Sequence, residues 1–450
     1  MISIKRFFSE ISQYPSAVIG LVLILALVAF AIYTVFALPY NEAISLWRGD
    51  ENVWYKTPRL AQPTWMNWFL KDDLPETLSF NTAEGQGTKT EEFSNDTNKI
   101  SISIPFEYNS TKYFPQELAI YFTSTYTTKQ PFVSIKMITP SGEEIRIGSF
   151  AVNKTQTYRF SQDQKLQRRL KGNSPEQGIF MDLESESEIP VAVPGHYELQ
   201  IEGVGFEKDS TVDAEFVVYG QVYGWAGTDH RRRDLSIALM WGAPVALTFG
   251  LLSALGTSIV TMIIAAIGTW YGGWIDEVIQ RITEVNLVLP FLSILIMIGT
   301  FYSKSLWVML MAVIALSIFG SGIKSFRAVF LQIKESGYVE AARAYGASNS
   351  RIIMRYLIPR IIPLLIPQLV ILIPSNVFLE ATLNALNLGD PVLPTWGKVI
   401  YEAAFRNAAL LNGQYYWVLE PAVILLITGL AFAMVGFSMD RVFNPRLRGV

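Results

Sequence analysis

Few residues in this chain have the types that enzymes use for nucleophilic or metal-assisted catalysis. The 450 residues include no cysteine and only two histidines, His196 and His230. A thiolate nucleophile, an iron–sulfur cluster, a disulfide framework and a multi-histidine catalytic metal site are therefore excluded. The segment GSGIKS at 320–325 faintly resembles a phosphate-binding loop, but it lacks the G-x-x-x-x-G-K-[ST] spacing and follows an apolar run. The sequence predicts no catalytic residue and no metal site, so any chemistry must be supplied by a partner.

The polar segment 335–360, ESGYVEAARAYGASNSRIIMRYLIPR, has a pattern typical of a protein contact. A short helix is expected around Glu340, and Gly346 is placed to end it in a left-handed conformation. Three alanines leave room for the backbone of another protein, and the tyrosines add aromatic contact area. The pattern fits a docking helix and a helix lying on lipid headgroups equally well. The candidate contact residues are Tyr338, Glu340, Ala341, Ala342 and Gly346.

A second group of polar side chains lies within the apolar run ILIPSNVFLEATLNAL at 371–386. A carboxylate inside a membrane segment costs roughly 2.5–3.5 kcal/mol on insertion scales, so Glu380 should face other helices or a wet cavity rather than lipid. Two interpretations stay open: a residue that lines a pathway or gate, and a hydrogen-bonded residue that packs helices together. The candidate pathway residues are Asn376, Glu380 and Asn384.

The overall composition indicates a membrane protein. Half of the residues are hydrophobic, only 17% are charged, and the mean hydropathy is +0.29. Soluble globular proteins carry about one quarter charged residues, so the shortfall is informative. The net charge of −3 argues against nucleic acid as a partner, because a nucleic-acid-binding domain is usually basic.

Six apolar runs are long enough to cross a hydrocarbon core of ~30 Å. They lie near 17–38, 245–270, 285–302, 305–323, 361–386 and 417–438. The first run is too long for a typical signal-peptide core, so an uncleaved span is expected. Six spans place both termini on the same side. Lys5, Arg6 and the many basic residues of 324–360 and 441–448 favour the cytoplasmic side.

Residues 41–226 differ from the rest, because apolar and polar side chains alternate there as in half-buried strands. The alternation is clearest at 100–108, 131–150, 195–204 and 214–224, and Pro140-Ser141-Gly142 signals a turn. We predict a mainly antiparallel β-domain, a sandwich of seven to nine strands. Because both termini are expected in the cytoplasm, this domain is expected outside the cell. The three N-x-[ST] sequons, at Asn95, Asn109 and Asn153, all fall in it, and glycosylation and chance explain them equally well.

The predicted fold is therefore an α-helical integral membrane protein of six transmembrane helices with an inserted, extracellular, mainly-β domain. Residues 1–40 are the cytoplasmic N-terminus and first span, 41–226 the β-domain, and 227–450 a core of five further spans that contains the loop 335–360.

The segment EAARAYGAS at 340–348, followed by Ile358-Pro359, resembles the EAA loop of ABC importer permeases, specifically those of the dipeptide/oligopeptide permease family. Other segments resemble the same family in its order. They are SEISQYPSAVIGLVLIL (9–25), GTDHRRRD (227–234), WYGGWIDEVIQRITEV (270–285), EATLNALNLG (380–389), PTWG (394–397) and NPRLR (444–448). The resemblance covers about 1–40 and 227–450.

Some positions depart from the family's pattern. Arg232 and Asn387 stand where the family usually has glycine, Tyr345 where it has leucine, and Arg360 where it has asparagine. The family's segment between the first two spans is commonly much shorter, so residues 41–226 form an insertion.

The resemblance implies the ABC importer permease fold and a chain that forms half of a translocation pathway for di- or oligopeptides. It implies a second related permease subunit, two ATPase subunits docked on the EAA loop, and an extracellular solute-binding protein. ATP and Mg would be bound by the ATPases, so this chain would hold no cofactor and would not be an enzyme. Glu380 matches the glutamate of the family's E-A-x-L motif.

Alternatives stay open for the cargo, the protein class and the insertion. Oligosaccharides are a second cargo, and a membrane-anchored surface receptor or a secondary transporter is a second class, although six spans and a docking loop favour the importer. The insertion is either a platform that orients the solute-binding protein or a protective cap, and its size favours the platform. The aromatic segment TWMNWF at 64–69 is expected to pack at its membrane-facing base.

Overall fold

The computed structural model describes residues 13–94, 97–182 and 190–443. It divides into two compact units, which we call the β-unit (Gly49–Ser236) and the helical unit (Met1–Arg48 with Ile237–Val450). Lys5, Arg6, Asn95 and the segment NPRLR lie outside the described residues.

The β-unit begins and ends later in the chain than the expected range 41–226. The end is later because the segment 227–234 is hydrogen-bonded to residues of this unit. The Thr228 hydroxyl donates to the carbonyl oxygen of Pro58 (2.8 Å) and accepts from the backbone N–H of Ala61 (2.9 Å). The beginning is later because α3 (Tyr40–Arg48) belongs to the helical unit.

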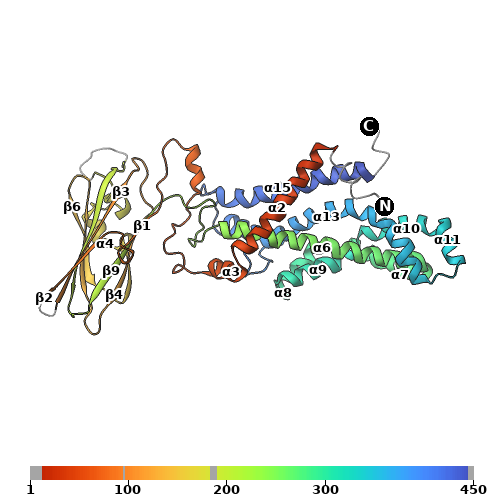
Figure 1. Ribbon diagram of the computed structural model, residues 1–450, viewed down its shortest axis with the longest axis horizontal. Coiled ribbons are helices and arrows are strands. Elements are labelled where there is room, and N and C mark those ends of the chain that lie inside the picture. Colours follow the sequence, from red (N-terminus) through yellow and green to blue (C-terminus); the bar gives the residue numbers. More distant parts are fainter. Residues whose placement is uncertain (1–12, 95–96, 183–189, 444–450) are drawn as a thin grey trace. The chain divides into compact units, whose positions relative to one another are not determined.

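The described part of the β-unit has nine strands in two antiparallel sheets (Figure 1). They are β1 (Leu78–Asn81), β2 (Thr88–Ser94), β3 (Thr97–Tyr108), β4 (Glu117–Thr125), β5 (Phe132–Ile138), β6 (Glu144–Ala151), β7 (Thr155–Arg159), β8 (Gly195–Gly205) and β9 (Thr211–Tyr219). The sheet orders are β1-β9-β4-β7 and β2-β3-β8-β5-β6. The predicted strands at 100–108 and 195–204 and the two strands within 131–150 are confirmed, whereas the strand predicted at 214–224 ends at Tyr219. Short helices complete the unit: η1 (Thr64–Phe69), η2 (Thr82–Glu84), η3 (Phe160–Gln162), α4 (Gln164–Arg169) and α5 (Pro175–Gly178).

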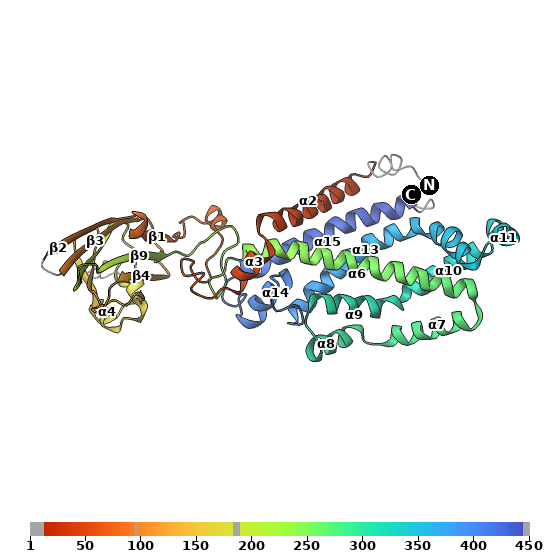
Figure 2. The same cartoon turned by 60° about the horizontal axis from the view of Figure 1, so that its bottom comes forward.

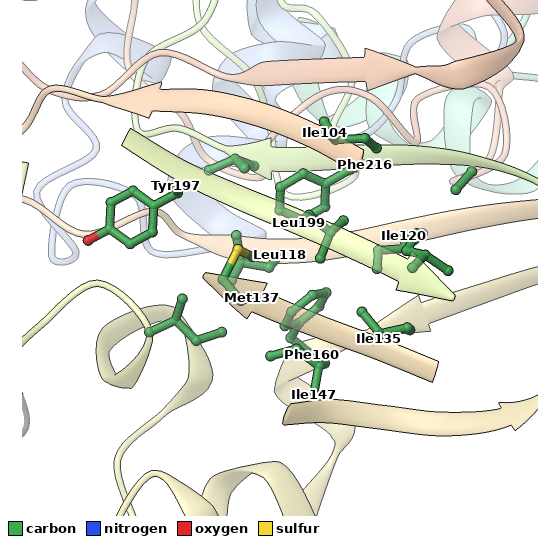
Figure 3. Close-up of a cluster of buried hydrophobic side chains, with 14 of the residues drawn as sticks. Ile104, Leu118, Ile120, Ile135, Met137, Ile147, Phe160, Tyr197, Leu199 and Phe216 are labelled. Atoms are coloured by element: carbon green, nitrogen blue, oxygen red, sulfur yellow. The ribbon is translucent and has the colours of Figure 1, made fainter. Parts of the chain in front are cut away.

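One apolar core lies between the inner faces of these sheets. Along β3 every second side chain is buried, because successive residues of a strand point to opposite faces. Phe106 of β3 lies in one sheet and Phe216 of β9 in the other, and their ring centroids are 5.4 Å apart. Figure 3 shows side chains of both sheets in this cluster, among them Leu199 of β8 and Ile120 of β4. The alternation of apolar and polar residues along the strands therefore places the apolar side chains of both sheets in one shared core.

The described part of the helical unit contains no strands, only helices joined by loops (Figure 2). They are α2 (Pro15–Ala37), α3, α6 (Ser236–Tyr271), α7 (Gly273–Val288), α8 (Phe291–Phe301), α9 (Leu306–Ile318), α10 (Ser321–Lys334), α11 (Gly337–Ala344), α12 (Asn349–Ile352) with η4 (Ile353–Leu357), α13 (Ile358–Ala385), α14 (Trp396–Tyr401) with η5 (Glu402–Arg406), and α15 (Tyr416–Phe443). Helix α2 runs along α15, and Gly20 permits this approach, since a Cβ there would lie 2.7 Å from the carbonyl oxygen of Ala431.

Four described helices are long and apolar enough to cross a membrane, or up to six candidate spans if each of two bent helix pairs counts as one. The runs expected at 285–302 and 305–323 each cross a break instead of forming one helix. Helices α7 and α8 meet at 78°, and α9 and α10 at 47°. Pro290 explains the first break, because proline lacks an N–H and disfavours helical conformation at the residue before it; Leu289 is extended. At the second break Gly320 is also extended.

Candidate functional site

Helix α11 ends in the way that its sequence predicts. Gly346 has a φ of +75°, the left-handed conformation expected of it, so this prediction is confirmed. Its N–H donates to the carbonyl oxygen of Arg343 (3.0 Å), and the N–H of Ala347 donates to that of Ala342 (3.0 Å). These two bonds form a Schellman motif, which satisfies carbonyls that the helix end would otherwise leave unpaired.

The two faces of α11 have different surroundings. Val339 and Ala342 are buried, and Val339 packs into a cluster with Phe330 of α10 and Ile352 of α12. The outer face is exposed and contains Glu340, Ala341, Ala344 and two tyrosines, of which Tyr338 is 43% and Tyr345 92% exposed. Of the three alanines expected to leave room for a partner, Ala341 and Ala344 are exposed, whereas the side chain of Ala342 faces inward. The helix is thus fixed on one side and open on the other.

Trp270, at the end of α6, links α11 to the longest helix of the unit. The guanidinium of Arg343 lies 5.7 Å from the centroid of the Trp270 ring, and the Lys334 ammonium 5.9 Å from it. Cations within about 6 Å of an aromatic face are attracted by its quadrupole. The Lys334 Nζ also donates to the carbonyl oxygens of Thr269 (2.9 Å) and Trp270 (3.1 Å), where a positive charge suits the helix dipole. A displacement of α11 would therefore act directly on α6.

An ion pair joins α7 to α10 near the same end of the unit. The Arg327 Nε donates to the Asp276 Oδ1 (2.8 Å) and its Nη2 to the Asp276 Oδ2 (2.5 Å), a bidentate arrangement that resists rotation. Sequence reasoning did not single out Trp270, Asp276 or Arg327. Asp276 does lie within the family-like segment 270–285, which was the available signal.

The candidate pathway residues lie on one helix, but the structure brings only two of them together. Glu380 and Asn384, one turn apart on α13, are both buried, and the Asn384 Nδ2 donates to the Glu380 Oε1 (2.6 Å). Asn376 is half-buried. Gly389 packs on the Asn384 side chain, since a Cβ there would lie 1.7 Å from its Oδ1. Glu380 and Asn384 thus form a buried polar pair against the chain that follows α13, in which the Glu380 Oε2 has no hydrogen-bond partner among the described residues.

The PTWG segment at 394–397 packs tightly against α6 and α13. Trp396 is fully buried, and its Nε1 donates to the carbonyl oxygen of Leu239 on α6 (2.8 Å). A Cβ at Gly242 of α6 would lie 2.2 Å from the Trp396 ring, and a Cβ at Gly397 would lie 2.2 Å from the carbonyl oxygen of Ala381. Both glycines are therefore required by close approach, which explains glycine beside tryptophan in this segment.

Two positions where the resembled family usually has glycine keep a left-handed backbone here. The φ angles are +66° at Arg232 and +60° at Asn387. In the β-unit the Arg232 side chain is 2% exposed, pairs with Glu117, donates to the carbonyl oxygen of Thr57 (2.7 Å) and covers the Tyr219 ring at 4.4 Å. These contacts offset the strain of a left-handed arginine. The conformation that glycine would permit is thus retained, although glycine is absent.

Two of the three sequons lie on the surface of the β-unit. Asn109 and Asn153 are exposed, and Asn95 lies outside the described residues. In the segment TWMNWF, Trp68 is 84% and Phe69 77% exposed. Its expected packing at a membrane-facing base stays a prediction.

Comparison with known proteins identifies the family. The profile described as "Binding-protein-dependent transport system inner membrane component" matches residues 258–449. The dipeptide transport system permease protein DppC of Bacillus subtilis is 29% identical over 225 residues, which are 50% of this chain and 69% of the relative. The oligopeptide permease OppC of the same species is 29% identical, covering 50% and 72%. A putative peptide transport system permease of Brucella suis is 30% identical, covering 49% and 73%.

This chain belongs to that family, the membrane permease components of ABC transporters, and the resemblance predicted from its motifs is confirmed. It is a multi-pass membrane protein. The residues matched by the family profile do not include the β-unit.

Proposed function

We propose that this chain is one of two permease subunits of an ATP-driven importer of di- or oligopeptides. It spans the membrane six times with both termini in the cytoplasm, and the β-unit lies outside. Two ATPase subunits, which bind ATP and Mg, dock on α11, and a solute-binding protein delivers the peptide from the other side. The names of the relatives support the cargo. The β-unit serves the solute-binding protein as a platform.

The observation that carries this proposal is the geometry of α11. A partner needs a surface that is exposed yet rigidly connected to the helices that must move. Helix α11 has both properties, because its outer face is open while Val339 is packed inside and Arg343 contacts Trp270. When the ATPases close, α11 displaces α6 through Trp270 and draws α10 with it. The Arg327–Asp276 pair carries α7 along, so the helices switch state as rigid bodies.

Charge reversal on the exposed face of α11 tests the proposal. In the assembled complex, Glu340→Lys is expected to abolish ATP hydrolysis stimulated by the loaded solute-binding protein, while the chain still inserts and is purified in normal yield. Glu335→Lys is the matched control, because Glu335 is also exposed but precedes α11. Normal coupling in the Glu340→Lys complex would refute docking on this helix.

A further inference from the structure

A polar cavity lies among the broken helices of the helical unit, apart from the Glu380–Asn384 pair. Its volume is about 340 Å³. The cavity is lined by Thr257, Ser258 and Thr261 of α6, by residues of the two breaks, and by Gln368 of α13. Figures 1 and 2 both place α9 alongside α6, and a Cβ at Gly256 would lie 2.8 Å from Ile314 of α9.

The N-termini of two half-helices border this cavity. Phe291, the first residue of α8, lines it, as do Ser321 and Gly322, the first residues of α10. Neither N-terminus is capped by a side chain. The first N–H groups of a helix have no partner within the helix, and they carry the positive end of its dipole. Both breaks therefore present hydrogen-bond donors to the cavity.

The carbonyl end of α9, which faces the same region, is already occupied. The Asn286 Nδ2 donates to the carbonyl oxygen of Leu316 (2.8 Å), and the Thr261 Oγ1 donates to that of Ile318 (2.9 Å). The N–H of Gly320 donates to the carbonyl oxygen of Ser317 (3.1 Å). The negative end at this break is thus covered by donors of the chain, whereas the positive end is left open.

Two hydroxyl groups at the cavity lack a partner within the described chain. Ser258 is 1% exposed, and neither its Oγ nor the Oγ1 of Thr257 is hydrogen-bonded to the residues that the structure describes. Ser253, one turn and a half earlier on α6, differs, because its Oγ donates to the carbonyl oxygen of Phe249 (2.6 Å). A buried hydroxyl without a partner costs free energy, and a ligand in the cavity would supply the missing partner. The described residues that line the cavity include no charged side chain.

We propose that this cavity is a carboxylate subsite that receives the C-terminal carboxylate of a peptide during its passage; this rests on the proposed peptide import. The hydroxyls of Thr257 and Ser258 and the N–H groups of α8 and α10 hold the carboxylate. Half-helix N-termini stabilise anionic substrate groups in this way inside membranes. Because no cationic side chain neutralises the carboxylate, binding is weak enough for release, which a translocation pathway requires.

Uptake by the complete complex in proteoliposomes, with its solute-binding protein and ATP, tests the subsite. The substrates are labelled Ala-Phe and its C-terminal amide, and the variant is Thr257→Val/Ser258→Ala. Because the solute-binding protein is unchanged, its own preference cancels when wild type and variant are compared. We expect the ratio of acid to amide uptake to fall about tenfold, as for the loss of a hydrogen bond to a charged group. The matched control Ser253→Ala should keep the wild-type ratio.

An equal loss for both peptides, or no loss, would overturn the subsite. Absence of uptake of the free acid by the wild-type complex would instead refute peptide import itself. A second measurement does not depend on uptake of the amide. Photolysis of Ala–photoleucine in the wild-type complex should attach the peptide within 257–261 or 320–322. Attachment only at other positions of this chain would contradict the proposal.

Discussion

The β-unit and the helical unit hold their polar side chains in different ways. In the β-unit, ion pairs join distant parts of the chain, as where Arg159 pairs with Glu51 (2.9 Å) and Arg232 pairs with Glu117. In the helical unit, many hydroxyls bond to carbonyls of their own helix, as those of Ser253 and Thr269 do. Apart from the Arg327–Asp276 pair between α7 and α10, several of its helix contacts lie at glycines, as at Gly20.

Under the proposed mechanism, the β-unit keeps one shape while the helical unit changes its shape. Directional ion pairs fix the elements that they join, whereas small residues let helices approach closely without charged links between them. The contrast fits a rigid β-unit attached to a permease core whose helices shift during transport. It also indicates which substitutions should damage each unit.

The largest effect is expected from bulk at a glycine of the helical unit. In Gly397→Ala the new Cβ would meet the backbone oxygen of Ala381, which cannot rotate away, so the destabilisation should reach about 3 kcal/mol. The yield of monodisperse protein after solubilisation should fall sharply. Gly337→Ala is the control, because no atom lies within 4 Å of its added Cβ. Equal yields of the two variants would contradict the claim that the helices of this unit depend on close contacts at glycine.

In the β-unit a buried charged side chain should also contribute measurably to stability. Arg232→Ala removes the contacts with Glu117, Thr57 and Tyr219 and should cost about 2–3 kcal/mol. Arg232→Gly should recover about 1 kcal/mol of this loss, because glycine adopts a φ of +66° without strain. Pulse proteolysis of the full chain in urea measures both. An alanine variant as stable as the glycine variant would contradict the role of the left-handed backbone.

A smaller effect is expected at Glu380. Glutamine keeps an oxygen that accepts from the Asn384 Nδ2, so Glu380→Gln should leave transport within about twofold of wild type. Glu380→Ala, which leaves Asn384 without this partner, should lower the thermal midpoint. Loss of transport in a stably folded Glu380→Gln complex would instead show that the charge acts in the pathway.

The smallest effect is a pH dependence of the β-unit. Hydrogen bonds from the Thr128 hydroxyl and from the backbone N–H groups of residues 127–129 lower the pKa of Glu207 to about 2. A lowered folded-state pKa contributes stability above the unfolded value near 4.5, and this contribution is lost as the pH falls toward 2. The difference in unfolding midpoint between wild type and Glu207→Gln should therefore be constant above pH 5.5 and shrink below 4.5. A constant difference down to pH 2.5 would refute it.

Features set by neighbouring residues could be predicted from the sequence. The strands of the β-unit follow from period-two alternation, and the end of α11 follows from glycine after a short Ala-rich helix. The pairing of Glu380 with Asn384 is also local, since residues four apart meet on one face of a helix. In each case the relevant physics acts within a few residues.

Features set by distant contacts could not be predicted. The contact of Arg343 with Trp270 and the pair of Arg327 with Asp276 join residues far apart in the sequence, and no spacing rule connects them. The breaks at Pro290 and Gly320 were missed because hydropathy averaged over a span does not register one backbone angle. The left-handed Arg232 depends on partners in other elements of the β-unit, which a local motif does not contain.

Site-specific cross-linking tests the central claim, that the outer face of α11 contacts the ATPase subunits, most directly. The chain contains no cysteine, so a single introduced cysteine is its only thiol. With a short thiol-to-amine cross-linker in the assembled complex, Ala341→Cys should link this chain to an ATPase subunit in high yield. Ala342→Cys, next in sequence but turned inward, should give little or none. Equal yields at the two positions, or no link from Ala341→Cys, would contradict the account.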